Sequence, residues 1–155
     1  MSFVSSLMEL RPDWIDGNGH LNMAYYNVLF DLACDEAWLD LGFGPGYRER
    51  TGHTTFAAEH RTRYLRELKP GSRVRVSFRL LDVGPKSFHY CQELRHEDGW
   101  LSATGEGLSL HVDQSGPRVV PYPPEIAARL EKMRADHAGP PVPDWVGSAM
   151  GLRKG

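Results

Sequence analysis

The sequence predicts an α+β fold in which one curved antiparallel sheet wraps around a long central helix. The segment from Met23 to Leu41 is apolar over most of its length and has the composition of a buried helix. Four strand-like runs follow it, and the short turns between them favour antiparallel pairing of consecutive strands. One helix and one sheet of this size fit within the 155 residues of the chain.

The composition indicates a globular domain and excludes several classes of partner. Apolar residues make up 41% and charged residues 25% of the chain. The net charge of -2 gives no basic field for binding nucleic acid. We find no segment apolar enough to span a bilayer and no signal-peptide pattern, so we expect no membrane partner and a cytoplasmic location. Cys34 and Cys91 lack C-x-x-C spacing and are expected to be reduced thiols.

The N-terminal part of the chain is expected to hold a short strand and the long helix. Residues 3 to 10 form the strand in this interpretation. Asn22 is a favourable N-cap for a helix over Met23–Leu41, and the Gly/Pro-rich stretch after it ends the helix. Because apolar side chains cover most of this helix, we expect other structure to enclose it. Its polar side chains form one narrow stripe of Asn27, Asp31, Asp35 and Asp40.

Turn signals divide the rest of the chain. Strand-like runs lie near residues 54–67, 73–83, 86–97 and 100–113, and Asp98-Gly99 marks a hairpin. A short helix is expected over Pro124–Arg134. We therefore assign a domain to residues 1–135 and a Pro/Gly-rich tail to residues 136–155. The sheet edges need covering, which favours a homodimer, and pairing of dimers into a tetramer is left open.

The stretch from Trp14 to Asn22 holds the main candidate for catalysis. A glycine-rich turn, Gly17-Asn18-Gly19, follows Asp16, and the helix begins soon afterwards. This order places a carboxylate close to the free N–H groups and the positive dipole end of the helix. A carboxylate that attacks or activates water, beside N–H groups that hold an oxyanion, is suited to acyl transfer. The spacing alone is equally consistent with a capped turn and an incidental aspartate.

This stretch resembles the signature of the hotdog-fold acyl-CoA thioesterases of the 4-hydroxybenzoyl-CoA thioesterase type. In that family an aspartate is followed by Gly-His-hydrophobic-Asn and then by a tyrosine on the central helix. The matching residues here are Asp16, Gly19, His20, Leu21, Asn22 and Tyr26. The resemblance covers residues 4 to 135 and implies a hotdog fold and acyl-CoA hydrolysis, with Asp16 as a catalytic residue.

A narrower likeness links the chain to the thioesterases associated with carnitine breakdown, which are thought to act on betainyl-CoA. The matching residues are Glu59, Asp82, Lys86, His89, Tyr90, Glu93, Ala103, Thr104, Glu106 and the run from Leu110 to Asp113. The chain departs from that group at Cys91 and Gln92, where an aromatic residue and a second histidine are expected. The acyl group therefore stays open between a short cationic group and a neutral fatty or aromatic group.

The resemblance gives Asp16 one of two roles. It is either the nucleophile, which forms a mixed anhydride, or the general base that activates water. Backbone N–H groups near Asn22 and Met23 are expected to stabilise the oxyanion. His20 and Asn22 either orient the turn and contact substrate or only cap the helix.

Glu59 is the second carboxylate of interest. It shares a strand face with Arg61 and Arg63, so a solvated row of ion pairs is one interpretation. The alternative places Glu59 across a dimer interface, where it binds a cationic acyl group or assists water. Aromatic faces attract a trimethylammonium group. The remaining candidates for the acyl pocket are Trp14, Tyr25, Tyr26 and His60.

Basic residues supply candidates for binding the coenzyme A phosphates. Arg61 and Arg63 are the first of these, since arginine binds phosphate through two parallel hydrogen bonds. Lys86, on the turn after Gly84-Pro85, is another. Trp38 lies deep in the helix and is expected to pack in the core.

Other chemistries lack their signatures. The histidines show neither H-E-x-x-H nor Cys/His zinc spacing, so we expect no metal. We find no phosphate-binding G-x-x-x-x-G-K run and no G-x-S-x-G serine motif. No separate cofactor is implied, because coenzyme A is part of the substrate. Two competing hypotheses are a non-catalytic acyl-CoA-binding hotdog module and a hotdog dehydratase; the complete signature around Asp16 argues against the first, and a missing histidine signature argues against the second.

Overall fold

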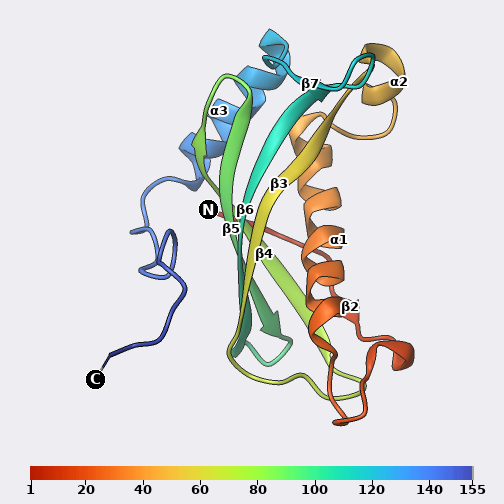
Figure 1. The fold of residues 1–155 in the computed structure, drawn as a ribbon, viewed down its shortest axis with the longest axis vertical. Coiled ribbons are helices and arrows are strands. Elements are labelled where there is room, and N and C mark those ends of the chain that lie inside the picture. Colours follow the sequence, from red (N-terminus) through yellow and green to blue (C-terminus); the bar gives the residue numbers. More distant parts are fainter. Residues whose placement is uncertain (155) are drawn as a thin grey trace.

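The structure of the protein is a computed structural model that describes residues 1–154. One sheet curves along one long helix, α1 (Figure 1). The elements in chain order are β1 (Phe3–Val4), β2 (Met8–Glu9), a 3-10 helix (Pro12–Trp14), α1 (Met23–Leu41), α2 (Tyr47–Thr51), β3 (His53–Tyr64), β4 (Arg73–Val83), β5 (Ser87–His96), β6 (Leu101–Asp113), β7 (Arg118–Val119) and α3 (Pro124–His137).

The sheet is antiparallel throughout, with the strand order β1-β4-β5-β6-β3. Strands β4, β5 and β6 form the expected meander, but β3 pairs with β6 and not with β4. The chain leaving β3 stays beside β6, because the Leu65 and Arg66 N–H groups both donate to the Ser102 carbonyl. The turn signal Pro70-Gly71 marks a reversal without specifying which strand becomes the neighbour. The expected pairing of β3 with β4 is therefore wrong.

Helix α1 has the bounds that the sequence predicts. The Asn22 side chain accepts the Ala24 N–H at 3.0 Å, and Gly42 ends the helix in the left-handed conformation at φ 92°. Neither α1 nor any other helix within residues 1–154 is long and apolar enough to cross a membrane. The side of α1 that packs on the sheet carries the buried residues Leu29, Phe30, Ala33 and Ala37.

The opposite side of α1 is uncovered in a single chain. Leu32 is 42% exposed and Leu39 is 55% exposed. The expectation that other structure encloses the helix is therefore wrong for one copy of the chain, because the sheet lies along one side of α1 only (Figure 1).

Trp38 packs in the core, as expected. Its ring meets those of Phe78 and Phe88 edge-on, with centroids 5.4 Å and 5.2 Å away. Its Nε1–H donates to Thr55 Oγ1 at 2.8 Å, which satisfies the one polar group of the indole. This tryptophan therefore fixes the C-terminal half of α1 against the sheet.

Three smaller elements differ from the expectations. Residues 3–10 form two strands, because Ser6 turns away from β4 and donates its N–H to Glu36 of α1 at 2.8 Å. The short α2 and β7 were not expected. Helix α3 continues past Arg134 to His137, whose Nδ1 accepts the Leu80 N–H at 3.0 Å and so draws the last turn onto β4.

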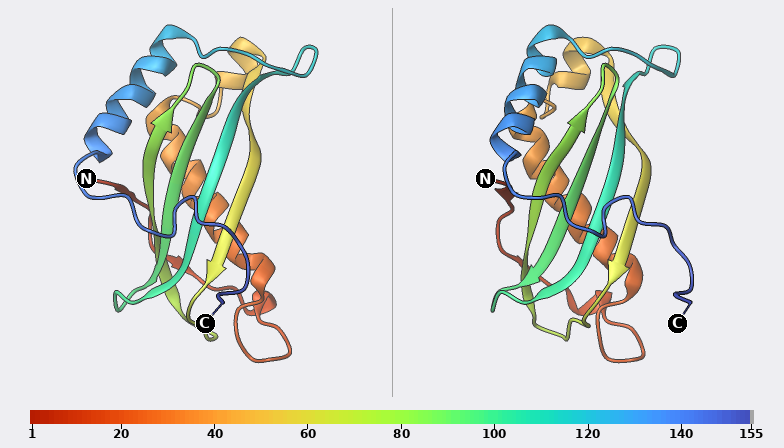
Figure 2. Two further views of the ribbon diagram at one scale, coloured as in Figure 1. Left: turned by 60° about the vertical axis from the view of Figure 1, so that its left-hand side comes forward. Right: turned by 90° about the vertical axis from the view of Figure 1, so that its left-hand side faces the viewer.

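The chain after α3 crosses the outer face of the sheet, which is the face opposite α1 (Figure 2). Arg79 of β4 donates to the Pro140 and Pro141 carbonyl oxygens, the second at 2.9 Å. The predicted tail is therefore held against the sheet along part of its course. Gly155, its last residue, lies outside the described residues.

Candidate active site

A closed loop holds Asp16 just before α1. Ile15 and Leu21 form an isolated antiparallel bridge, and the Asp16 N–H donates to the His20 carbonyl at 3.0 Å. The Gly19 N–H donates back to the Asp16 carbonyl at 3.0 Å, and Gly19 has φ 81°, a left-handed conformation that favours glycine. The glycine-rich turn thus fixes the backbone of Asp16 next to the helix.

The Asp16 carboxylate borders a cavity at the start of α1. Its Oδ1 accepts the Asn18 N–H at 2.8 Å, and its other oxygen has no hydrogen-bond partner within residues 1–154. The cavity has a volume of about 410 Å³. Its lining includes Asp16, His20, Asn22, Met23, Tyr26 and Tyr64. The carboxylate and the first turn of the helix therefore face the same space.

The backbone N–H groups at the start of α1 differ in their partners. The Asn22 N–H donates to the Trp14 carbonyl at 3.0 Å, and the Ala24 N–H donates to the Asn22 side chain. The Met23 N–H has no hydrogen-bond partner in the part of the chain that the structure describes. Of the two amides expected to hold an oxyanion, Met23 is the available donor, at the positive end of the helix dipole.

The aromatic candidates divide between this cavity and the core. Tyr26 and Tyr64 meet edge to face at the cavity, with centroids 5.0 Å apart. Burial raises the pKa of the Tyr26 phenol, so this group stays protonated. Trp14 and Tyr25 stack on each other at 5.5 Å and pack against the core, and neither lines the cavity.

His20 borders the cavity and is held by Glu67, another residue of the lining. Its Nε2 lies 3.5 Å from Glu67 Oε2. Its carbonyl closes the Asp16 loop, so the residue has a clear orienting role in the structure. The residues that the structure brings together here are Asp16, His20, Asn22, Met23 and Tyr26.

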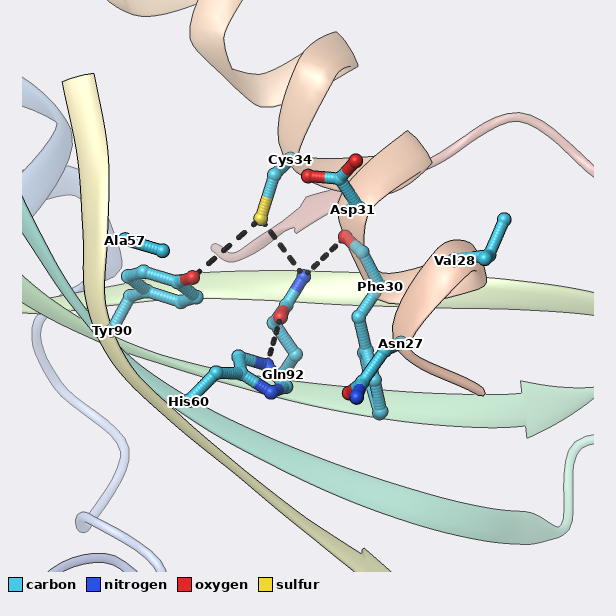
Figure 3. A pocket seen from close by; sticks show the side chains of 9 residues that line it. All are labelled: Asn27, Val28, Phe30, Asp31, Cys34, Ala57, His60, Tyr90 and Gln92. Carbon is cyan, nitrogen blue, oxygen red and sulfur yellow. Dashed lines mark hydrogen bonds between the residues drawn. The ribbon is translucent and has the colours of Figure 1, made fainter. Parts of the chain in front are cut away.

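A second cavity of about 350 Å³ lies between α1 and β3 (Figure 3). Its walls are largely apolar and include the rings of Phe30, His60 and Tyr90. The Asp31 carboxylate stands at its side and forms no hydrogen bond or ion pair within residues 1–154. Of the sequence candidates, His60 lies here. The sequence places Asp31 in the polar stripe of α1 but does not predict it as a site residue, because it does not show which strand the stripe faces.

Cys34 borders the second cavity, while Cys91 lies on the neighbouring strand β5. Both are free thiols and both are buried. Burial raises the pKa of Cys34 to about 12 and that of Cys91 to about 11, so both remain protonated at neutral pH. Neither is suited to act as a nucleophile.

Glu59, Arg61 and Arg63 lie on the outer face of β3. The alternate residues His60 and Thr62 face α1, where His60 packs on Phe30 and Thr62 bonds to Asn27. In a single chain the sheet therefore separates Glu59 from both cavities beside α1. Glu59, Arg61 and Arg63 therefore share one face of β3, as the alternation of side chains along a strand predicts.

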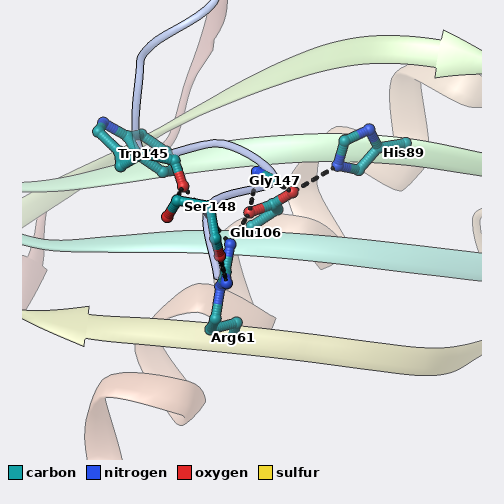
Figure 4. A network of polar contacts seen from close by, with 6 residues as sticks. All are labelled: Arg61, His89, Glu106, Trp145, Gly147 and Ser148. Carbon is teal, nitrogen blue, oxygen red and sulfur yellow. Dashed lines mark hydrogen bonds and ion pairs between the residues drawn. The ribbon is translucent and has the colours of Figure 1, made fainter. Parts of the chain in front are cut away.

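The C-terminal tail forms hydrogen bonds with both Arg61 and Glu106 (Figure 4). Arg61 Nη2 donates to Glu106 Oε2 at 2.7 Å and to the Trp145 carbonyl at 3.4 Å. Glu106 Oε1 also lies 2.9 Å from His89 Nε2 and accepts the Gly147 N–H at 2.9 Å. Arg61 is thus already paired, whereas Arg63 and Lys86 form no ion pair within residues 1–154 and are the freer candidates for coenzyme A phosphates.

We expect the tail to detach from this network in acid. Burial raises the pKa of the Glu106 carboxyl, but hydrogen bonds from Gly147, Arg61 and His89 outweigh it and leave the pKa below its usual value. Such a group stabilises the folded form above the unfolded-state pKa, and that stability is lost as the pH falls through the folded pKa, which lies below the pKa of a free glutamate. The protection factor of the Gly147 amide, which corrects the exchange rate for the intrinsic slowing of exchange in acid, should be high at neutral pH and should fall in acid.

The Glu106→Gln variant provides the matched comparison. It removes the charge that holds Arg61 and Gly147, so exchange at the Gly147 amide should be about tenfold faster already at neutral pH. Slow exchange in the variant, or pH-independent opening in the parent protein, would contradict the role assigned to Glu106.

Comparison with known proteins places this chain in a family. Residues 10–130 match the thioesterase-like superfamily. The betainyl-CoA thioesterase of Pseudomonas aeruginosa is 37% identical over 142 residues, which cover 91% of this chain and 89% of that protein. The chain belongs to the thioesterase-like superfamily. It is a thioester hydrolase, and this confirms the hotdog fold and the enzyme class that the Asp16 signature implied.

One further relative and one solved structure are also similar to this chain. The L-carnitine dehydrogenase/betainyl-CoA thioesterase of Agrobacterium fabrum is 37% identical over 137 residues, which cover 88% of this chain but only 28% of that longer protein. A Staphylococcus aureus protein solved in complex with CoA superposes with a TM-score of 0.92 at 24% identity, over 99% of this chain and 96% of the other. At that identity the superposition shows the shared fold.

Proposed function

We propose that this superfamily member hydrolyses an acyl-CoA with a short cationic acyl group, such as betainyl-CoA, and that Asp16 carries the chemistry. The observation behind the proposal is the shared cavity of the Asp16 carboxylate and the unpaired Met23 N–H. The similarity to a protein named betainyl-CoA thioesterase supports the substrate class.

Two routes fit the arrangement around Asp16. In both, the thioester oxygen accepts the Met23 N–H, which stabilises the negative charge that develops on it. In one route an Asp16 oxygen attacks the carbonyl carbon, coenzyme A leaves as the thiolate, and water then cleaves the mixed anhydride. In the other, Asp16 takes a proton from the water that attacks the carbonyl. Both routes release the free acid and coenzyme A.

Asp31 is the carboxylate best placed to bind a cationic acyl group. A trimethylammonium needs a negative charge and aromatic faces, and the second cavity offers the Asp31 carboxylate beside Phe30 and Tyr90. Glu59, the candidate from the sequence, lies on the other face of the sheet. Glu59 can bind the cationic group only if a second copy of the chain packs on this face and places its acyl cavity next to Glu59.

The distance between the two cavities supports a homodimer. Asp31 lies eight residues beyond Met23 on α1, which corresponds to about 12 Å. A short acyl group held at Asp31 cannot reach Asp16 of the same chain, so the two carboxylates would come from two copies. The outer edge of β3 has no partner strand within residues 1–154, and Phe56 of this strand is 45% exposed. We propose that β3 pairs with β3 of a second copy.

A hydrolysis screen tests the proposed function. Thiol release should be measured over a panel of acyl-CoAs that includes betainyl-CoA and tert-butylacetyl-CoA, in which carbon replaces the quaternary nitrogen. We expect kcat/KM to be about tenfold or more higher for betainyl-CoA, because the neutral analogue gains nothing from Asp31. A higher kcat/KM for neutral fatty or aromatic acyl-CoAs would contradict the proposed cationic substrate class. Binding of acyl-CoA without any thiol release would indicate a non-catalytic module.

A further inference from the structure

Gln92 is a buried polar residue at the base of the cavity between α1 and β3 (Figure 3). Its side chain is 1% exposed, and its Nε2 donates to the Phe30 carbonyl of α1 at 3.1 Å. A carbonyl oxygen can only accept, so this contact requires the amide nitrogen on that side. The Gln92 Oε1 atom must therefore point in the opposite direction, towards β3.

The atom that Gln92 Oε1 faces is His60 Nε2, at 3.4 Å. Because an amide oxygen only accepts, His60 Nε2 must carry the hydrogen. In a neutral imidazole the other nitrogen, Nδ1, is then an acceptor. It lies 3.5 Å from Thr62 Oγ1, which donates its only hydrogen to Asn27 Oδ1 at 2.9 Å and therefore offers none to Nδ1. The tautomer is thus set from the Gln92 side. The amide of Gln92 thus selects one tautomer of His60.

The surroundings of His60 also disfavour its protonated form. The ring packs on Phe30 at 5.5 Å and lies over Gly105 of β6, where a Cβ atom would come within 3.0 Å of Nε2. Burial lowers the pKa of His60, and the Gln92 hydrogen bond and the Asp31 charge oppose it more weakly. The titratable groups facing the ring are Asp31 and Cys34 from α1 and Tyr90 from β5.

We propose that Gln92 is a positioning residue that keeps His60 in its neutral Nε2–H form, so that this wall of the cavity admits a cationic acyl group. The substrate part of this inference rests on the proposed function, whereas the tautomer part does not.

The tautomer can be observed by NMR correlation of ring nitrogens with ring protons in the free protein. At neutral pH we expect His60 to carry its hydrogen on Nε2. Gln92→Met keeps the length of the side chain but removes the acceptor, so the Nδ1–H form should appear. His111, held by Tyr47 and the Val120 carbonyl, serves as the internal control for an intact fold. An Nδ1–H or doubly protonated His60 in the parent protein, or an unchanged His60 in the variant, would overturn the proposal.

Substrate selectivity provides the second readout. The ratio of kcat/KM for betainyl-CoA to that for tert-butylacetyl-CoA should fall at least about tenfold as His60 becomes protonated, because like charges repel in a partly buried site. The fall should follow the His60 titration seen by NMR, and His60→Asn should abolish it. A pH-independent ratio, or an equal fall in His60→Asn, would contradict the selectivity role. If neither acyl-CoA is hydrolysed, the proposed function fails, while the NMR result still decides the arrangement of Gln92 and His60.

Discussion

The Asp16→Asn variant is expected to lose about a thousandfold or more in kcat while it still binds acyl-CoA. The amide can accept the same Asn18 N–H as the carboxylate, so the loop that holds residue 16 should persist. It can neither attack a thioester as an anion nor take a proton from water. Thiol release under saturating substrate measures the loss, and binding of a non-hydrolysable CoA thioether measures retained affinity.

A nearby aspartate supplies the matched control for that experiment. Asp13 is exposed and lies outside the cavity, and within residues 1–154 it pairs only with Arg11. Asp13→Asn should therefore turn over like the parent protein, since exposed ion pairs contribute little. Turnover of Asp16→Asn at the parental rate would remove Asp16 from the mechanism. Equal losses in the two variants would point to a general effect of charge or folding.

Labelled water distinguishes the two routes open to Asp16. After turnover in water enriched in heavy oxygen, a nucleophilic Asp16 acquires label whenever water attacks its side of the mixed anhydride. A general base never exchanges its own oxygens. Label found by mass spectrometry in the peptide that contains residue 16 would therefore establish the covalent route.

Asp31→Asn should have the second largest effect, and this effect should depend on the substrate. At a separation of about 5 Å and an effective dielectric constant near 20, two opposite charges interact by about 3 kcal/mol. The variant should thus lose about a hundredfold in kcat/KM for betainyl-CoA and little for tert-butylacetyl-CoA. Steady-state kinetics with both substrates measures the difference.

Glu59→Gln is the comparison that decides between the two candidate carboxylates. Glu59 lies on the outer face of the sheet, so we expect its variant to treat the two substrates as the parent protein does. A selective loss of betainyl-CoA turnover in Glu59→Gln, with none in Asp31→Asn, would move the cation site to Glu59 of a partner copy. Equal losses for both substrates in both variants would remove the cation site altogether.

Local sequence signals were sufficient for the elements that depend on near neighbours. The bounds of α1 follow from the Asn22 cap and Gly42, and the loop that presents Asp16 follows from Gly19. Both involve contacts between residues close in the chain. The same signals therefore identified the carboxylate and the start of the helix together, as the structure shows them.

Contacts between distant residues were beyond such signals. The pairing of β3 with β6 depends on how the chain crosses the end of the sheet, and the register places Arg61 opposite Glu106 and thus beneath the tail. The same pairing brings His60 of β3 to the cavity that Asp31 of α1 borders. The polar stripe on α1 includes Asp31, but it indicates a binding site only when the strand that faces the stripe is known. The sequence therefore did not predict the cavity between α1 and β3.

The most direct test of the account is a crystal structure of the Asp16→Asn protein with intact betainyl-CoA. We expect the thioester oxygen to accept the Met23 N–H, with the carbonyl carbon against residue 16 and the trimethylammonium beside an Asp31 carboxylate. A thioester bound away from the first turn of α1, with residue 16 facing no part of it, would contradict the account.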